Sequence, residues 1–130
     1  MDRTARRILI VDDEAPLLRM MSLFLGRHGY AVTTAEATDK AWALVQADPS
    51  AFDVAVLDGS MAGMSMEDLA MRLLSANPSM CILAASGYHV DISAISAKAP
   101  GRVAFLLKPF TPHSLTAAVG GLLAAQEKDV

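Results

Sequence analysis

Apolar residues in this chain fall into short continuous runs that are separated by longer amphipathic segments. The runs 8–11, 52–58, 81–85 and 103–107 consist almost entirely of Ile, Val, Leu, Ala and Phe, and 30–34 is a shorter run rich in β-branched residues. Near-continuous apolar character is typical of strands that are buried on both faces, as in parallel sheets. The pattern therefore predicts five strands.

The segments between these runs place apolar residues at helical spacing. In the first, Leu17, Leu18, Met21 and Leu25 share one face, and Asp13 is the expected N-cap. Helices are predicted over 15–28, from 38 or 39 to Pro49, over 65–76, over 90–98 and from 111 to about 123. The 90–98 segment has the weakest amphipathic pattern because its apolar residues are mostly β-branched.

Strand and helix patterns thus alternate five times, which predicts an α/β fold with a doubly wound parallel sheet. Right-handed crossover connections leave few topologies for such a chain. With 130 residues, the sequence is expected to form a single domain that needs no disulfide or structural metal.

Composition narrows the setting in which the protein works. The formal net charge is −3, which argues against nucleic-acid binding because that function requires a basic face. Cys81 is the only cysteine and lies in a predicted buried strand, which fits a reducing compartment. We find no signal peptide and no apolar stretch of about 18 residues, so we expect a soluble, cytoplasmic protein with no membrane contact.

Polar residues that can carry chemistry stand where the predicted strands end. Asp12 and Asp13 follow the first run, Asp58 closes the third, Ser86 follows the fourth, and Lys108 follows the fifth. The carboxyl ends of parallel strands meet at one edge of a sheet, so three carboxylates would repel one another there. A bound divalent cation is the usual way to offset such repulsion.

Taken together, these residues make the chain similar to the receiver domain of two-component response regulators over essentially its whole length. The resemblance rests on four segments in order: Ile10-Val11-Asp12-Asp13-Glu14, Val56-Leu57-Asp58, Ala85-Ser86-Gly87-Tyr88 and Leu107-Lys108-Pro109-Phe110. It implies a flavodoxin-like five-stranded parallel sheet of order 2-1-3-4-5 with helices on both faces. It also implies one receiver domain over 1–130, with its core at about 7–125.

The resemblance implies a role for each of these polar residues. Asp58 would accept a phosphoryl group, Lys108 would contact a phosphoryl oxygen, and the Ser86 hydroxyl would bond to the group once it arrives. Mg²⁺ would be held by Asp12, Asp13, Asp58 and the backbone carbonyl of Ser60, with Asp12 acting through water. The Lys108–Pro109 peptide bond is expected to be cis.

Other positions would transmit and time the signal. Ser86 and Phe105 match the family's switch pair, and Ser60 and Tyr88 occupy positions that tune hydrolysis of the aspartyl phosphate. Ala62 stands where the family usually has proline, which should enlarge the mobile ensemble of its loop. We expect that change to affect kinetics or partner choice and to leave activity intact.

The predicted function is a phosphoryl-accepting switch that receives phosphate from a histidine kinase or phosphotransfer domain and has at most slow autophosphorylation and autodephosphorylation. A homodimer is possible. Because no output domain follows, we expect either a stand-alone regulator or the receiver of a hybrid kinase or longer regulator.

Three alternatives remain open at this stage. The first is a Mg²⁺-dependent phosphohydrolase with an Asp nucleophile, although Ser60 stands where its second carboxylate should be. The second is a flavodoxin-like cofactor binder, although the acids 12–14 would repel a phosphate. The third is a degenerate receiver that serves only as a docking module.

Overall fold

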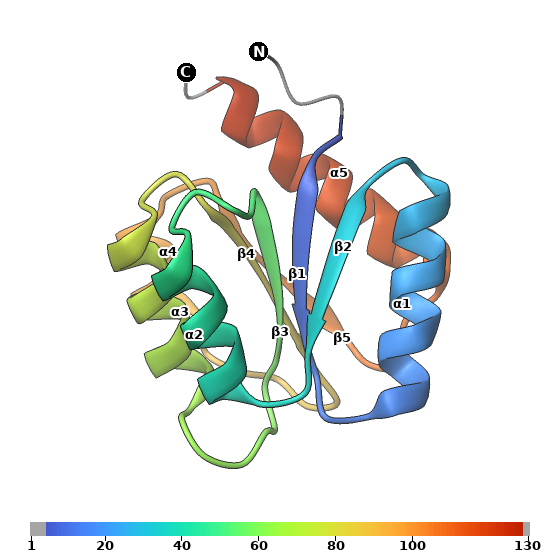
Figure 1. Ribbon diagram of the computed structural model, residues 1–130, viewed down its shortest axis with the longest axis horizontal. Helices are drawn as coiled ribbons and strands as arrows, with labels where there is room; N and C mark the ends of the chain where they lie inside the picture. The colour runs from blue at the N-terminus through green and yellow to red at the C-terminus, as the bar shows by residue number, and fades with distance from the viewer. Residues whose placement is uncertain (1–4, 129–130) are drawn as a thin grey trace.

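The structure, a computed structural model, describes residues 5–128, in which five strands alternate with five helices (Figure 1). The strands are β1 (Arg7–Val11), β2 (Ala31–Ala35), β3 (Val54–Asp58), β4 (Cys81–Ser86) and β5 (Val103–Leu107). The helices are α1 (Ala15–Arg27), α2 (Thr38–Ala47), α3 (Met66–Ala76), α4 (Ser93–Lys98) and α5 (Pro112–Lys128).

All five strands form one parallel sheet in the order β2-β1-β3-β4-β5. The predicted flavodoxin-like fold and its strand order are therefore confirmed. β1 pairs with both β2 and β3, and Val11 lies opposite Leu57 in the β1–β3 register. This register brings the carboxyl ends of β1 and β3 together in the middle of the sheet.

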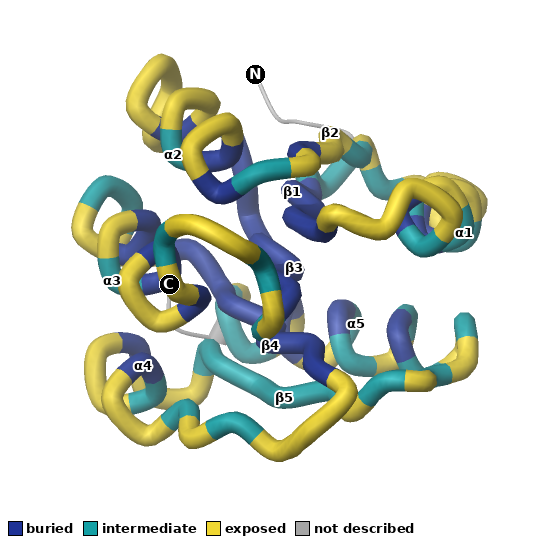
Figure 2. Tube along the Cα trace, turned by 90° about the horizontal axis from the view of Figure 1, so that it is seen from below, coloured by how far each residue is buried: buried dark blue, intermediate teal, exposed yellow. Residues whose placement is uncertain are grey.

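Helices cover both faces of the sheet. Seen from the carboxyl ends of the strands, α2, α3 and α4 lie on one side, and α1 and α5 on the other (Figure 2). Side chains of β1 alternate between the two resulting cores: Leu9 and Val11 pack in the core under α2, α3 and α4, while Ile8 and Ile10 pack in the core under α1 and α5. This division follows from the two-residue period of a strand.

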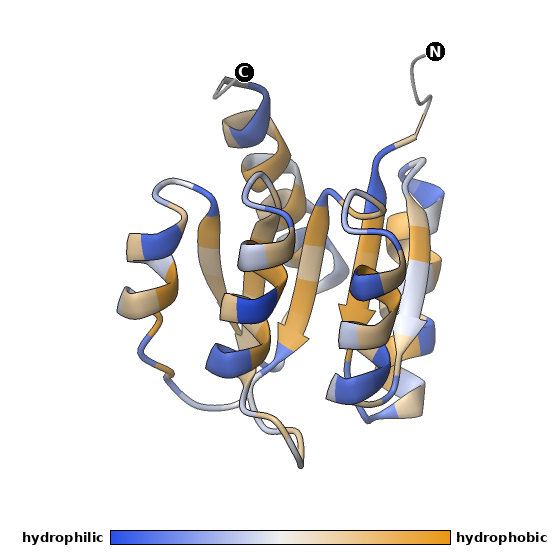
Figure 3. Ribbon diagram, turned by 60° about the vertical axis from the view of Figure 1, so that its left-hand side comes forward, coloured by the Kyte–Doolittle hydropathy of each residue, from blue (hydrophilic) through white to orange (hydrophobic). Residues whose placement is uncertain are grey.

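Burial distinguishes the central strands from the edges. Every residue of β3 and β4 is buried, which matches their continuous apolar sequences. The edge strand β2 is mostly exposed, and its threonines make it paler than the central strands in the hydropathy view (Figure 3). Cys81 is buried in β4, as predicted, and its thiol lies 3.4 Å from the Leu122 carbonyl oxygen.

Two helix starts differ from the prediction. The N-cap of α1 is Glu14, and no side chain caps it, so the expected capping role of Asp13 is wrong. Instead, Asp12 Oδ1 accepts a hydrogen bond from the Glu14 amide at 2.9 Å. A local side-chain acceptor of this kind offers the backbone an alternative to a helix cap.

The second difference is α4, which begins at Ser93 rather than at Val90. The Asp91 carboxylate accepts hydrogen bonds from both the amide and the hydroxyl of Ser93. These bonds to Ser93 lower the pKa of the exposed Asp91 carboxyl. Asp favours such turns because its side chain bonds to the backbone two residues on, so residues 90–92 remain outside the helix.

Other helix starts agree with the sequence. Ser65 caps α3, because its hydroxyl accepts a hydrogen bond from the Asp68 amide at 3.0 Å. Thr111 does the same for α5 through the Ser114 amide, also at 3.0 Å, with Pro112 as the first helical residue. Among the helices of residues 5–128, none combines the length and the apolar content that crossing a membrane requires.

The Ser65 cap gives a prediction about stability. Replacing Ser65 with Ala removes the acceptor for the Asp68 amide and should lower the free energy of unfolding by about 1 kcal/mol. Ser65→Asn keeps a capping oxygen and should remain close to wild type. Urea denaturation of the three proteins checks this, and an equal loss in both variants would contradict the capping role.

Candidate functional site

Three carboxylates gather where β1 and β3 end. Asp58 is the last residue of β3, and Asp12 and Asp13 follow β1 directly. One oxygen from each of the three lies within 4.8 Å of the others. In a sheet of this strand order, β1 and β3 flank the point where the winding direction reverses, and ligands bind in the crevice there.

Asp58 is buried, at 4% exposure, and its two oxygens differ in their surroundings. Oδ1 accepts hydrogen bonds from the amide of Ser60 at 3.2 Å and from its hydroxyl at 3.1 Å. Oδ2 is buried and has no hydrogen-bond partner among the described residues. A buried anionic oxygen without a partner is costly, so this atom is available to a ligand.

Lys108 supplies the positive charge of the site. Its Nζ lies 2.9 Å from Asp12 Oδ2 and 3.3 Å from Asp58 Oδ1. Burial disfavours the charged ammonium, but the nearby Asp12 and Asp58 carboxylates outweigh that effect and raise the pKa of Lys108 above its ordinary value of 10.5. Lys108 is therefore a fixed cation, and its peptide bond to Pro109 is cis, as expected.

The three acids fit a hard divalent cation. They offer only oxygen ligands, two of the residues are buried while Asp13 is exposed, and Asp58 Oδ2 has no hydrogen-bond partner within residues 5–128. Mg²⁺ binds through one or two carboxylates and keeps several waters. The exposure of Asp13 would give a cation and its waters access to the cluster.

Ser86 stands at the end of β4, next to the acidic cluster. Asp58 pairs with Ala85 in the β3–β4 register, so Ser86 lies one residue beyond the neighbour of Asp58. Its hydroxyl oxygen accepts a hydrogen bond from the Tyr88 amide at 3.3 Å and makes no bond to Asp58. The predicted hydroxyl is thus at the site edge, with its own proton free to bond to another acceptor.

Phe105, the other predicted switch residue, lies on β5 away from the acids. It is half-buried, packs against the core under α2, α3 and α4, and contacts the ring of His89 with 5.6 Å between centroids. His89 could not be selected from the sequence, because an isolated histidine belongs to no recognisable motif. The Glu14 carboxylate, which was not among the predicted site residues, lies 3.9 Å from Lys108 Nζ.

A hollow of about 790 Å³ opens beside the acids. Tyr88, in the β4–α4 loop, lines it and is 58% exposed. The remaining lining combines polar site residues with apolar residues of α1 and of the β5–α5 connection: Glu14, Pro16, Leu17, Met20, Ser60, Gly87, Lys108, Pro109 and Phe110.

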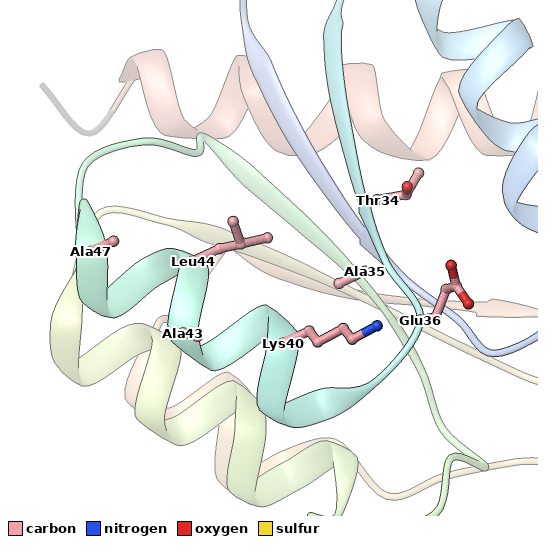
Figure 4. Close-up of a pocket in the computed structure, with 7 residues that line it drawn as sticks. All are labelled: Thr34, Ala35, Glu36, Lys40, Ala43, Leu44 and Ala47. Atoms are coloured by element: carbon pink, nitrogen blue, oxygen red, sulfur yellow. The ribbon is translucent and has the colours of Figure 1, made fainter.

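A second hollow, of about 450 Å³, lies between β2 and α2 (Figure 4). Glu36 and Lys40 are the charged residues of its lining, which otherwise consists of Thr34, Leu44 and small alanines. None of the predicted site residues lines it. The predicted chemistry is therefore confined to the carboxyl edge of β1, β3, β4 and β5.

Comparison with known proteins identifies the family of the chain. The family model of the response regulator receiver domain matches residues 8–120. The alginate biosynthesis transcriptional regulatory protein AlgB of Pseudomonas aeruginosa is 31% identical over 121 residues, which are 93% of this chain and 26% of AlgB. The phosphate regulon transcriptional regulatory protein PhoB of the same species is 34% identical over 123 residues, 91% of this chain and 52% of PhoB.

Solved structures agree with these sequence relatives. A CheY-like response regulator receiver domain protein from Methanospirillum hungatei is 27% identical, with a TM-score of 0.84 and coverage of 98% of this chain and 100% of that one. This chain spans about a quarter of AlgB and about half of PhoB. The match over 8–120 shows that the chain belongs to the response regulator receiver domain family, whose members are the phosphoryl-accepting switches of two-component signalling.

Proposed function

We propose that Asp58 accepts the phosphoryl group from a phosphohistidine of a histidine kinase or phosphotransfer domain, in a reaction that requires Mg²⁺. The observation that carries this proposal is the buried Oδ2 of Asp58, which has no hydrogen-bond partner among residues 5–128 and lies beside two further carboxylates and a lysine. Asp12, Asp13, Asp58 and the backbone carbonyl of Ser60 would hold the metal. The role of the Ser60 carbonyl stays a prediction from the family resemblance.

The chemistry is a transfer between two nucleophiles. An Asp58 carboxylate oxygen forms a bond to phosphorus, the phosphorus–nitrogen bond of the donor breaks, and the leaving imidazole takes a proton. The product on this chain is an acyl phosphate. When bound, Mg²⁺ would offset the negative charge on the phosphoryl oxygens.

Lys108 and Ser86 would stabilise the product. The Lys108 ammonium already lies 3.3 Å from Asp58, so a phosphoryl oxygen on that residue comes within its reach. The Ser86 hydroxyl oxygen accepts a hydrogen bond from the Tyr88 amide, and its own proton can be donated to another phosphoryl oxygen. Phe105 would then turn inward, so that added charge is detected as altered packing near β4 and β5.

Ser60 and Tyr88 would set how long the phosphoryl group survives. Ser60 holds Asp58 Oδ1 through two hydrogen bonds, and the exposed Tyr88 ring can shield the group from water. Ser60 also occupies the position at which a phosphohydrolase of this kind needs a second carboxylate. Its hydroxyl is a poor general base, which favours slow self-dephosphorylation over turnover.

The whole protein's partners and output are further proposals. AlgB and PhoB are transcriptional regulators by name and are longer than this chain, which makes a longer regulator a plausible context beside a stand-alone switch or a hybrid kinase. The cytoplasmic location, the possible homodimer and the effect of Ala62 stay predictions.

The main prediction concerns Asp58. Incubation with acetyl phosphate and Mg²⁺ should add one phosphoryl group to the wild-type chain, and intact mass spectrometry measures the addition. The adduct should be absent from Asp58→Asn and from wild type in chelator, because the first lacks the nucleophile and the second lacks the metal.

An adduct on Asp58→Asn would place the acceptor elsewhere. If no adduct forms on the wild type, free phosphate measured in the same tubes decides between the alternatives. Rapid, sustained release would support the phosphohydrolase, and no release would support a docking module.

Lys108 gives a prediction about stability. Without metal, Lys108→Met leaves Asp12 and Asp58 buried without their counterion and should lower the free energy of unfolding at pH 7 by roughly 2 kcal/mol. Mg²⁺ should stabilise this variant more than wild type, because it replaces the missing positive charge. Urea denaturation in chelator and in Mg²⁺ tests both effects, with the exposed Lys40→Met as control. An equal response of both variants to Mg²⁺ would contradict the proposal.

The interaction of Lys108 with Asp12 and Asp58 also makes the stability of the protein depend on pH. Folding raises the pKa of Lys108 above 10.5, so the folded state binds its proton more tightly than the unfolded state. The stability from Lys108 is therefore fully present below pH 10.5 and is lost as the pH rises through the raised value. In chelator, the free energy of unfolding of wild type should therefore approach that of Lys108→Met over that alkaline range. A gap between the two free energies that widens there would refute the raised pKa.

A further inference from the structure

Gly59 follows the proposed phosphoacceptor and has almost no room for a side chain. A Cβ atom built on it would lie 3.0 Å from Ser86 Cβ, 3.2 Å from Ser86 Oγ and 3.4 Å from Val90 Cγ2. Gly59 is not among the described glycines with positive φ, in contrast to Gly63 at φ 89°. The lack of room for a side chain, and not the backbone conformation, therefore favours glycine at position 59.

The closest of these contacts cannot relax easily. Ser86 Cβ is bonded directly to the backbone of β4, and Ser86 is buried. The backbone on both sides is fixed, because the Gly59 amide donates to the Ala85 carbonyl at 2.8 Å and the Lys108 amide donates to the Ser86 carbonyl at 2.7 Å. A side chain at 59 would therefore displace either the Ser86 side chain or the loop that carries Ser60.

We infer that Gly59 is a positioning residue, which acts by leaving the Ser86 side chain free to reach a phosphoryl group on Asp58. This inference rests on the proposed function of Asp58 and Ser86. Gly59 lies between the two in space, since it directly follows Asp58 and its Cα faces the Ser86 side chain. The Ser86 hydroxyl oxygen accepts a hydrogen bond from the Tyr88 amide at 3.3 Å, and its proton would be donated to a phosphoryl oxygen. A methyl group at 59 would lie 3.0 Å from Ser86 Cβ and 3.2 Å from Ser86 Oγ, and would press that hydroxyl out of its place.

The test compares Gly59→Ala, Ser86→Ala and the double variant with wild type. Gly26→Ala is the matched control, because a Cβ at Gly26 meets no atom within 4 Å. NMR of the metal-free, unphosphorylated proteins measures the Ser86 Cβ resonance, which should shift in Gly59→Ala and stay unchanged in Gly26→Ala. This readout does not depend on phosphorylation.

Phosphorylation by acetyl phosphate gives the second readout. Gly59→Ala should slow adduct formation roughly tenfold, the scale of one lost hydrogen bond to a charged group, with Mg²⁺ affinity unchanged. Because the effect passes through the Ser86 hydroxyl, Gly59→Ala/Ser86→Ala should be no slower than Ser86→Ala alone. If Gly59→Ala only distorted the loop, it would also weaken Mg²⁺ binding. Its effect on the rate of adduct formation would then multiply with the effect of Ser86→Ala.

Each of three results would overturn the inference: an unshifted Ser86 resonance, a wild-type phosphorylation rate in Gly59→Ala, or effects of the two substitutions that multiply. An adduct on wild type would uphold the proposed function in each of these cases. No adduct on wild type would overturn the proposed function, and the role of Gly59 with it. If Gly59→Ala does not fold, Gly59→Ala/Ser86→Gly removes both Ser86 atoms that the new methyl meets and should fold. Failure of that variant too would place the constraint elsewhere.

Discussion

Mutual repulsion of three carboxylates at one edge of the sheet is the constraint on which the site depends. Asp12 and Asp58 are buried, and the Lys108 ammonium offsets part of their charge at 2.9 and 3.3 Å. The balance is incomplete, because three acids of the described residues cluster with one lysine, and Asp58 Oδ2 has no hydrogen-bond partner within that part of the chain. The same imbalance that costs stability would favour a bound cation at this site.

The fold brings these charges together from distant parts of the chain. Asp12 and Lys108 are 96 residues apart, and they meet because β1 and β5 run parallel in one sheet with their carboxyl ends at the same edge. Two apolar cores hold that sheet, one on each face. Rigid central strands thus fix the backbones that carry the acids, while the loops that begin at the same edge carry Ser60 and Tyr88.

Much of this arrangement could be predicted from the sequence because apolar runs and the polar residues that end them are local signals. The start of α1 could not be predicted, because the Asp12 carboxylate accepts a hydrogen bond from the Glu14 amide and no side chain caps the helix. The predicted start of α4 was wrong for a similar reason, because the Asp91 carboxylate accepts a hydrogen bond from the Ser93 amide in a turn. Gly59 carries no chemical group and belongs to no pattern, so only the distance to Ser86 reveals its constraint. The assigned roles of the site residues rest on family resemblance and geometry together.

The shortness of α4 has a consequence for how the domain can respond. Six helical residues contain few internal hydrogen bonds, and Ile95 is the buried side chain that anchors them to the core. Isolated segments of this length are far from self-sustaining, so the free energy that opposes local opening is small compared with that of β3 or β4. Amide hydrogens of residues 93–98 should exchange with solvent long before those of the central strands. A small change in charge can therefore rearrange the segment that follows Ser86 more readily than the central strands.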